Sequence, residues 1–327
     1  MQYKSNKGFT GLGQLGMLIL FLGLGLILAS VVQLIIGYQM VPRGTTLSQL
    51  EGALLQAMKD PKNVQLLRLL QIAGTFCVMF VPAVLFSLIC NGKNLFWLGF
   101  NKYFNLHQVA IGFLIIFGAN IMAGPLQDLS EMVVSHFGSL NAMAKNLEQV
   151  YNDQVVILSH LSGLPDLFLA IIIMAFFPAL FEELFFRGAL QTLLVKWWKK
   201  PLLAIIVTAV IFSFIHMSVY LFLSRIILGF VLGLLFHKTR NIWVNTIAHF
   251  LNNTIAVIQM YVLSNSKEKI DVSKLDPKID WWFGVIALGI LYGLFLFLDR
   301  YSEKNKMKIH TKEQVLLANE TGGDLIA

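Results

Sequence analysis

The segment Pro178-Ala-Leu-Phe-Glu-Glu-Leu-Phe-Phe-Arg187 decides how this chain is interpreted. It continues an apolar run that begins at Leu167, so Glu182 and Glu183 fall at the depth where a membrane-spanning helix meets hydrocarbon. On insertion scales, an ionised carboxylate at the centre of a span costs about 2.5–3.5 kcal/mol. Two adjacent carboxylates at that depth therefore indicate a functional site or a buried ion pair.

The spacing to Arg187 distinguishes the two carboxylates. Arg187 follows Glu183 by four residues, the helical spacing at which a guanidinium and a carboxylate meet on one face. Glu182 points about 100° away around the helix, so Arg187 is less well placed to pair with it. The spacing predicts a structural ion pair for Glu183 and leaves Glu182 available for chemistry.

Composition places the chain in a membrane. Of its 327 residues, 57% are hydrophobic and only 13% are charged, and the mean hydropathy is +0.70. These values lie outside the range of soluble globular proteins. We predict an all-α fold, a polytopic membrane helical bundle of about eight transmembrane helices. The predicted spans are Gly13–Gly37, Leu66–Cys90, Val109–Met132, Leu167–Leu190, Leu202–Met217, Tyr220–Phe236, Ile242–Leu263 and Trp281–Leu298.

Lysine and arginine are distributed unequally between the two sides of this bundle. Most of the 25 Lys and Arg residues fall in segments on the side of the N-terminus. By the positive-inside rule, this asymmetry predicts that both termini are cytoplasmic. We expect an integral protein of the bacterial inner (cell) membrane, whose net charge of +7 reflects topology and contact with anionic lipid. The sequence has no basic stripe with interleaved aromatic residues, so no nucleic-acid partner is expected.

Polar residues at similar depth occur in three of the predicted spans. Span five ends in Phe212-Ser-Phe-Ile-His216, and span seven carries His249 and Asn253 four residues apart on one face. At 1.5 Å per residue, Glu182, both histidines and the asparagine lie about 13–22 Å from the inner boundary. Side chains from three helices are therefore expected to converge in one layer near the middle of the membrane.

These residues resemble the motifs of a known family in order and spacing. Glu182-Glu183-x-x-x-Arg187, Phe212-x-x-x-His216 and His249-x-x-x-Asn253 are similar to the three motifs of the CAAX protease and bacteriocin-processing family of intramembrane glutamic endopeptidases. The resemblance implies an eight-helix fold in which Glu182 and His216 activate a water molecule. It also implies that His249 and Asn253 stabilise the oxyanion. The implied supporting residues are Glu183, Arg187 and Phe212.

The resemblance covers roughly residues 165–255 and divides the chain into three parts. Residues 1–164 hold N-terminal transmembrane helices with amphipathic outer segments, 165–255 form the CAAX-protease-like catalytic core in spans four to seven, and 256–327 hold the last transmembrane helix and a basic, polar cytoplasmic tail. Within the first part, the outer segment around 133–166 has apolar residues at helical spacing. It is either a lid or substrate platform over the site or a solvated connector.

The chemistry of these residue types agrees with hydrolysis of a peptide bond. A carboxylate can accept a proton from water, and an adjacent imidazole can hold that water in line. Loss of one hydrogen-bond donor to the oxyanion typically lowers the rate about 100- to 1000-fold. We therefore expect an intramembrane endopeptidase that needs no cofactor and forms no covalent intermediate. Its expected substrate is a membrane-embedded or membrane-associated protein or peptide, cleaved near the C-terminus of a lipidated protein or within a peptide precursor.

Each polar residue also has a purely structural explanation. The two glutamates can form an ion-pair network with Arg187 and Arg225 that only fixes helix packing. His216 at a span end can be an interfacial histidine, and His249 and Asn253 can join helices by hydrogen bonds. Their joint occurrence favours a site over these separate explanations.

Three other function classes stay open. Two Glu and two His residues suit zinc by ligand type, although no His-Glu-x-x-His helix occurs and Asn253 is a poor zinc ligand. A protein of the same fold can instead act in bacteriocin self-immunity or membrane scaffolding without catalysis, but every motif residue is present here. If the protein were a secondary transporter, its sequence would be expected to show inverted repeats and helices broken at mid-membrane. Pro178 interrupts span four, but no matching segment accompanies it.

Two further features predict structure without chemistry. Cys77 and Cys90 lie about 20 Å apart on one hydrophobic helix, so they cannot pair with each other and are interpreted as buried structural residues. Gly229-x-x-x-Gly233 in span six predicts a close approach of two helices.

Overall fold

The chain is helical in a computed structural model that describes residues 3–158, Leu161, 163–265 and 279–322. These ranges contain no β-strand, which confirms the predicted all-α fold. The stretches η2 (Phe76–Phe80), η4 (Ile171–Phe176) and η5 (Leu184–Gln191) are π-helical, and η1 (Pro61–Asn63) and η3 (Leu95–Leu98) are single 3₁₀ turns. In chain order the elements are α1 (Gly11–Tyr38), α2 (Leu47–Met58), η1 (Pro61–Asn63), α3 (Val64–Thr75), η2 (Phe76–Phe80), α4 (Val81–Cys90), η3 (Leu95–Leu98), α5 (Leu106–Ser135), α6 (Gly138–Leu158), α7 (Leu164–Ala170), η4 (Ile171–Phe176), α8 (Phe177–Glu183), η5 (Leu184–Gln191), α9 (Thr192–Trp198), α10 (Pro201–Ile215), α11 (Phe222–Thr239), α12 (Ile242–Ser264) and α13 (Trp281–Gly322).

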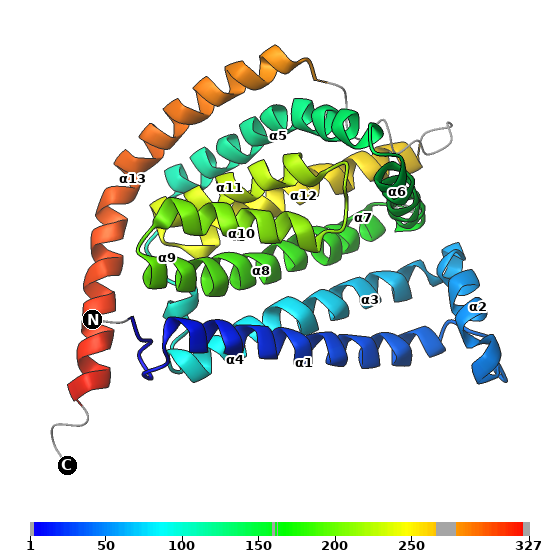
Figure 1. The fold of residues 1–327 in the computed structure, drawn as a ribbon, viewed down its shortest axis with the longest axis horizontal. Coiled ribbons are helices and arrows are strands. Elements are labelled where there is room, and N and C mark those ends of the chain that lie inside the picture. The colour runs from blue at the N-terminus through cyan, green and yellow to red at the C-terminus, as the bar shows by residue number, and fades with distance from the viewer. Residues whose placement is uncertain (1–2, 159–160, 162, 266–278, 323–327) are drawn as a thin grey trace.

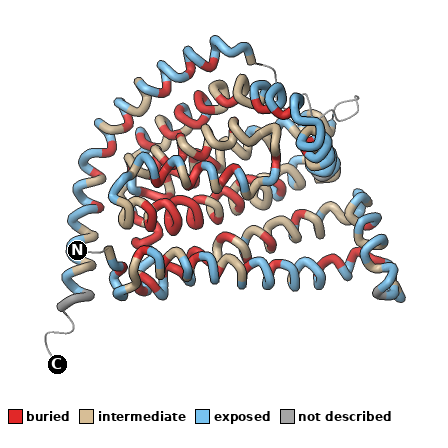
Figure 2. The backbone as a smooth tube through the Cα atoms, viewed as in Figure 1, coloured by how far each residue is buried: buried red, intermediate tan, exposed pale blue. Residues whose placement is uncertain are grey.

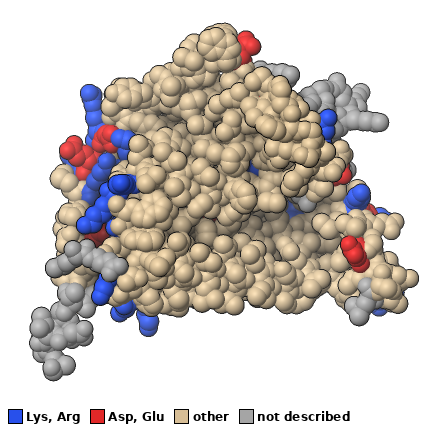
Figure 3. All heavy atoms as spheres, in the orientation of Figure 1, with Lys and Arg blue, Asp and Glu red and all other residues tan. Residues whose placement is uncertain are grey.

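Six helical runs within the described ranges are long and apolar enough to cross a membrane. They are Gly11–Tyr38, Pro61–Cys90, Leu106–Ser135, Leu164–Trp198, Phe222–Thr239 and Trp281–Asn319. Of the other two predicted spans, α10 has only 15 residues, and α12 carries His249 and three asparagines among its 23. A polytopic helical membrane bundle is therefore confirmed, whereas the count of eight spans stays a prediction. Figure 3 agrees, since charged side chains gather at the two ends of the molecule and are sparse between them.

The long helices lie side by side along the long axis of the molecule (Figure 1). The helix α1 packs against α3 and α4 on one side, and α5 packs against α13 on the other. Between them, α8, η5, α10, α11 and α12 supply about half of the side chains in the two largest buried clusters (Figure 2). The N-terminus, α9 and the second half of α13 share one end, whereas α2 and α6 lie at the opposite end. Both cysteines are free and buried, as predicted.

The run from α7 to α9 is one long helix that contains two π-helical stretches. Pro178 lies two residues after the end of η4. A proline ring has no N–H and clashes with the carbonyl one turn earlier in a regular α-helix, and a wider turn relieves that clash. The same arrangement recurs at Pro82, two residues after η2. The wide turn of η4 changes the helical register just before Glu182 and Glu183, so it sets the direction in which they point.

The two glycines of the Gly229-x-x-x-Gly233 motif face α10, as their spacing predicted. A Cβ on Gly229 would lie 3.2 Å from the backbone of α10, and one on Gly233 would lie 2.7 Å from a side chain of α10. The same glycines also accept hydrogen bonds from η5. Arg187 Nη2 donates to Gly229 O at 3.1 Å, and Gln191 Nε2 donates to Gly233 O at 2.9 Å. The motif therefore joins α11 both to α10 and to the helix that carries the two glutamates.

The outer segment 133–166 is mostly the helix α6, and residues 159, 160 and 162 lie outside the described ranges. Two contacts join α6 to the connection between α10 and α11 and to the first turn of α11. The Tyr220 hydroxyl donates to Asn141 Oδ1 at 2.8 Å, and the Arg225 guanidinium lies 6.0 Å from the centroid of the Tyr151 ring. The helix therefore lies beside the segment that follows His216. Its use as a lid or substrate platform stays a prediction.

Candidate active site

Glu183 and Arg187 form the ion pair that their spacing predicted. Arg187 Nη1 donates to Glu183 Oε1 at 2.8 Å, and both side chains are fully buried. The Arg187 guanidinium also lies 5.0 Å from the centroid of the Phe212 ring, a cation–π distance. Phe212 therefore supports the site by packing against this cation. Together with the bond to Gly229, these contacts tie η5 to both α10 and α11.

Glu183 receives hydrogen bonds from three side chains. Besides Arg187, Asn245 Nδ2 donates to its Oε2 atom at 3.1 Å, and His249 Nδ1 lies 2.9 Å from Oε1. A buried carboxylate needs such donors to offset the loss of water, so the arrangement accounts for a fully buried charge here. Asn245 also donates to Leu232 O at 2.7 Å. It was not among the predicted site residues, although it precedes His249 by one helical turn on the same face of α12.

Glu182 lies near both predicted histidines. Its Oε2 atom is 4.0 Å from His216 Nε2 and 3.9 Å from His249 Nε2, and its side chain is 16% exposed. These distances are too long for direct hydrogen bonds and fit a water molecule held among the three groups. Glu182 comes from α8, His216 from the end of α10 and His249 from α12. The predicted convergence of three helices is thus present in the structure for these three residues.

His216 is fixed by its own helix. Its Nδ1 atom lies 2.7 Å from Phe212 O, and its ring centroid lies 4.5 Å from that of Phe212. A carbonyl oxygen only accepts, so Nδ1 carries the proton in this bond. Arg225 Nη1 donates to the His216 carbonyl oxygen at 3.3 Å and so holds the end of α10. The neutral ring therefore presents the lone pair of Nε2 toward Glu182.

His249 is held in the corresponding way by a carboxylate. Because ionised Glu183 only accepts, the Nδ1 atom of His249 donates to it. The neutral ring then has a lone pair on Nε2, which faces Glu182. While Nδ1 donates to Glu183, His249 can donate to an oxyanion from Nε2 only if that nitrogen carries a proton as well. Its predicted role as a donor thus requires the imidazolium form, with Glu183 as the acceptor on the far side.

Asn253 is the predicted site residue that the structure does not join to the others. It follows His249 by one turn of α12 and is half-buried, and its side chain makes no hydrogen bond in the described ranges. Its neighbour Asn252 accepts a hydrogen bond from Asn120 of α5 and therefore connects two helices. Asn253 lies on the face of α12 that bears His249, so its role as a donor stays a prediction.

The zinc alternative is not supported by ligand spacing in the described part of the chain. No three His, Cys, Asp or Glu side chains there form a group that could hold a metal ion. Glu182 and the two histidines nevertheless approach one another through atoms that can bind zinc, and both histidines donate from Nδ1 to protein acceptors, a pattern of zinc-bound histidines. Zinc therefore stays an alternative to be tested by metal removal.

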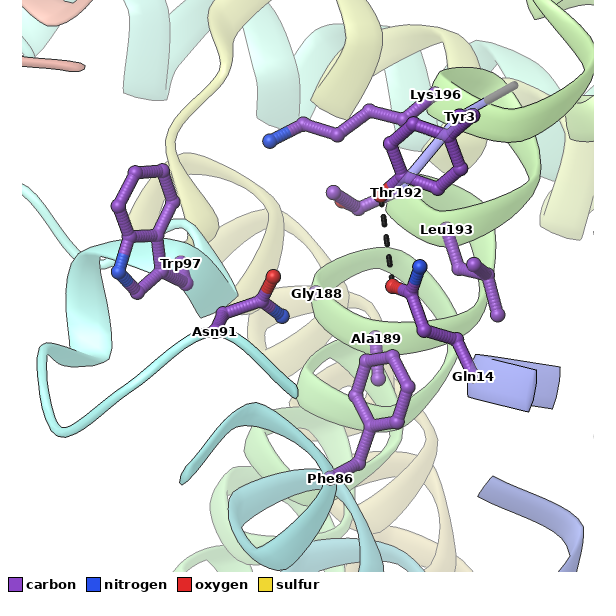
Figure 4. A pocket seen from close by; sticks show the side chains of 10 residues that line it. All are labelled: Tyr3, Gln14, Phe86, Asn91, Trp97, Gly188, Ala189, Thr192, Leu193 and Lys196. Carbon is purple, nitrogen blue, oxygen red and sulfur yellow. Dashed lines mark hydrogen bonds between the residues drawn. The ribbon is translucent and has the colours of Figure 1, made fainter. Parts of the chain in front are cut away.

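A pocket farther along η5 and α9 is separate from this group (Figure 4). It lies toward the end of the molecule with the N-terminus, where Tyr3 donates to Gln14 Oε1 at 3.4 Å beside Thr192 and Lys196. Its volume of about 10 Å³ has room for about one water molecule. We therefore do not assign it to a peptide substrate.

The comparison with protein families concerns the segment that carries these residues. Residues 164–255 match the family model described as type II CAAX prenyl endopeptidase Rce1-like. The predicted resemblance is confirmed. The match runs from the start of α7 into α12 and includes Glu182, His216 and His249. No curated protein matches the chain, and no solved structure matches it. Together with the apolar helices, the family match indicates an integral membrane protein with a protease type of function.

Proposed function

We propose that this protein is an intramembrane endopeptidase in which Glu182 activates water for attack on a peptide bond. The observation that supports this most directly is the approach of Glu182 to His216 and His249, which come from three helices. Ionisable groups inside a membrane bundle usually mark function rather than packing. The match of residues 164–255 to an endopeptidase family supports the same class of reaction.

In the proposed reaction, Glu182 accepts a proton from water while the water oxygen forms a bond to the carbonyl carbon of the substrate. His216 accepts a hydrogen bond from the same water through Nε2, and its bond to Phe212 O fixes the direction of that contact. Glu182 then gives its proton to the amide nitrogen as the C–N bond breaks. The products are a carboxylic acid and an amine, and the cycle needs neither a cofactor nor a covalent intermediate.

The proposed oxyanion donors are His249 and Asn253. In its doubly protonated form His249 donates from Nδ1 to Glu183 and from Nε2 to the oxyanion, so the buried ion pair and Asn245 orient the donor. Asn253, one turn farther along α12, supplies a second donor on the same face. Glu183 and Arg187 act as positioning residues, since neither reaches the water.

The proposed substrate is a peptide bond in a membrane-embedded or membrane-associated chain. A segment near the C-terminus of a lipidated protein, or a peptide precursor, meets this requirement because its lipid or apolar part brings it to the depth of Glu182. We further propose that the protein resides in the bacterial inner membrane with both termini cytoplasmic, because Lys and Arg are concentrated on that side.

Cleavage of fluorogenic peptides, with and without a prenyl group, by purified protein in detergent tests the proposal. Glu182→Gln is expected to lower kcat at least about 100-fold, a typical contribution of a general base, without loss of folded protein. Glu51→Gln, at an exposed position of α2, is the matched control and keeps wild-type activity. Full activity of Glu182→Gln would end the glutamate mechanism. If wild-type protein cleaves no probe while it binds one, a non-catalytic immunity or scaffolding role is favoured.

A further inference from the structure

The helix α13 is too long to lie within a membrane. Its 42 residues extend about 63 Å at 1.5 Å per residue, roughly twice the hydrocarbon thickness of a bilayer. The first part, Trp281–Leu298, is apolar, whereas charged residues recur from Asp299 onward. Figure 1 shows this second part crossing the end of the molecule that bears the N-terminus. We call residues 299–319 the surface segment, because its composition and position place it at the membrane surface.

One face of the surface segment is fastened to the bundle. Ser302 and Asn305 are buried there, and both hydrogen-bond the Gln108 side chain at the start of α5. The carboxylates on this face each pair with two cations. Asp299 pairs with Lys238 and Lys306, and Glu313 pairs with Lys196 and Arg240. These ion pairs neutralise the acidic groups that face the bundle.

The other face keeps its positive charge. Lys304, Lys308 and Lys312 follow one another at four-residue spacing and line an open groove of about 550 Å³. In the described ranges, no Asp or Glu lies within ion-pair distance of these three lysines, and Lys312 Nζ lies 5.2 Å from the Phe96 ring centroid. The exposed Glu303 is adjacent in sequence but does not line the groove.

The rest of the groove lining is largely apolar. Met307, Val315 and Tyr103 lie between and beside the lysines, together with Thr311. An apolar surface continues from Tyr103 into the next residues, since Phe104 is 40% exposed and Leu106 is 80% exposed. The groove therefore combines ammonium groups with apolar side chains at the level where headgroups meet hydrocarbon.

We propose that this groove binds an anionic phospholipid, with the phosphate among the three lysines and the start of the acyl chains against Met307, Val315 and Tyr103. A lipid accounts for both halves of the lining, because its phosphate complements the lysines and its chains cover the apolar residues. Inorganic phosphate accounts for only the first half. In Figure 3 the Lys and Arg side chains gather at this same end of the molecule, where the lipid headgroups would meet them.

Binding is measured on the full chain in dodecyl maltoside by native mass spectrometry, with added 1-palmitoyl-2-oleoyl phosphatidylglycerol or the matching phosphatidylcholine. Wild-type protein is expected to retain the anionic lipid at least about tenfold more tightly. With all three lysines changed (Lys304→Gln, Lys308→Gln and Lys312→Gln), affinity for phosphatidylglycerol is expected to fall about 100-fold, from the usual contribution per basic residue. The triple Lys→Arg variant keeps the charge and is expected to stay within about threefold of wild type.

The matched control removes three positive charges at the opposite end of the molecule. Arg43, Lys59 and Lys62 are exposed in or beside α2 and η1, and their triple Gln variant is expected to bind phosphatidylglycerol as wild type does. If this control loses as much affinity for phosphatidylglycerol as the surface-segment Gln variant, the effect is due to overall charge and the proposed site is wrong. Unchanged binding by the surface-segment Gln variant would overturn it too. Displacement of the lipid by equimolar inorganic phosphate, or by an acidic peptide of higher affinity, would assign the groove to that ligand instead.

Discussion

Asn245 orients Glu183 from α12, and this contact predicts a kinetic effect. Asn245→Leu leaves Glu183 Oε2 and Leu232 O without their donor, which is expected to cost about 1–3 kcal/mol of stability. Because His249 then bonds to a less firmly held carboxylate, kcat should fall while KM changes little. Thermal unfolding and steady-state kinetics provide the measurements.

Thr246→Val is the matched control for this substitution. Thr246 is the next residue of α12, is equally buried, and its hydroxyl has no hydrogen bond within the described residues. Replacing it with the isosteric valine removes a buried hydroxyl that has no partner among the described residues, so stability should stay the same or rise by about 1 kcal/mol, with kcat unchanged. If Thr246→Val and Asn245→Leu have equal effects, packing of α12 explains both, and the positioning role of Asn245 is wrong.

The two mechanisms of water activation differ in what they require of metal and of Asn253. If Asn253 donates to the oxyanion, Asn253→Ala should lower kcat about 100- to 1000-fold with little change in KM. Protein dialysed against a chelator should keep its activity. Elemental analysis of the same sample should show that it contains no metal. If zinc is the catalyst, chelation removes activity and added zinc restores it. If active protein contains one zinc ion per chain, and zinc and activity are lost and regained together, then zinc and not Glu182 activates the water.

The residues that sequence could predict are those whose partners lie on the same helix or at the same depth. Glu183 and Arg187 are four residues apart, so helical spacing alone predicts their ion pair. Depth from the inner boundary predicts that His216 and Glu182 lie in one layer. Asn245 could not be assigned in this way, because its partner Glu183 lies on another helix and their contact depends on how α12 packs.

At the scale of elements, the glycines of α11 predict a stability difference. Gly229→Ala places a methyl group 3.2 Å from the backbone of α10, and the Arg187 bond to Gly229 O leaves α11 little room to move. The expected loss is about 1–3 kcal/mol, typical of overpacking. Gly289→Ala on α13 is the matched control, since no atom lies within 4 Å of its added Cβ, and it should gain up to about 1 kcal/mol from helix propensity. Thermal unfolding in detergent compares them, and similar stabilities would show that α10 and α11 separate easily.

Several element boundaries depend on features that hydrophobic periodicity does not detect. The apolar run around Glu182 predicts one span, but the π-helical stretches η4 and η5 within it change the direction of its side chains. Pro178 and Pro82 mark where such wide turns occur, yet a proline alone predicts only a kink. The predicted last span ends at Leu298, whereas α13 continues to Gly322 because its polar residues bond to α5 and to the helix ends.

For the whole molecule, composition is sufficient to predict a helical membrane bundle, because a chain this apolar must satisfy its backbone hydrogen bonds internally. Composition does not predict the order of the helices in space. The packing of α1 against α3 and α4, away from α12, follows from side-chain fit across interfaces. In lipid, apolar surface does not by itself select one neighbour over another. Polar bonds between helices, such as Asn245 to Glu183, add the selectivity that hydropathy lacks.

The arrangement of the two ends predicts which positions a membrane-impermeant maleimide reaches in intact cells. Single cysteines at Glu51 of α2 and Asn146 of α6 should react without permeabilisation, because both positions are exposed at the end that the proposed topology places outside the cell. Cysteines at Lys93 and Glu303, exposed at the end with the N-terminus, should react only after permeabilisation. The wild-type chain is the blank, since Cys77 and Cys90 are buried and should not react.

The reverse pattern of reactivity would invert the topology and place the surface segment outside the cell. Reaction of Glu51 and Glu303 variants from the same side would contradict an arrangement in which α2 and the surface segment lie on opposite faces of the membrane.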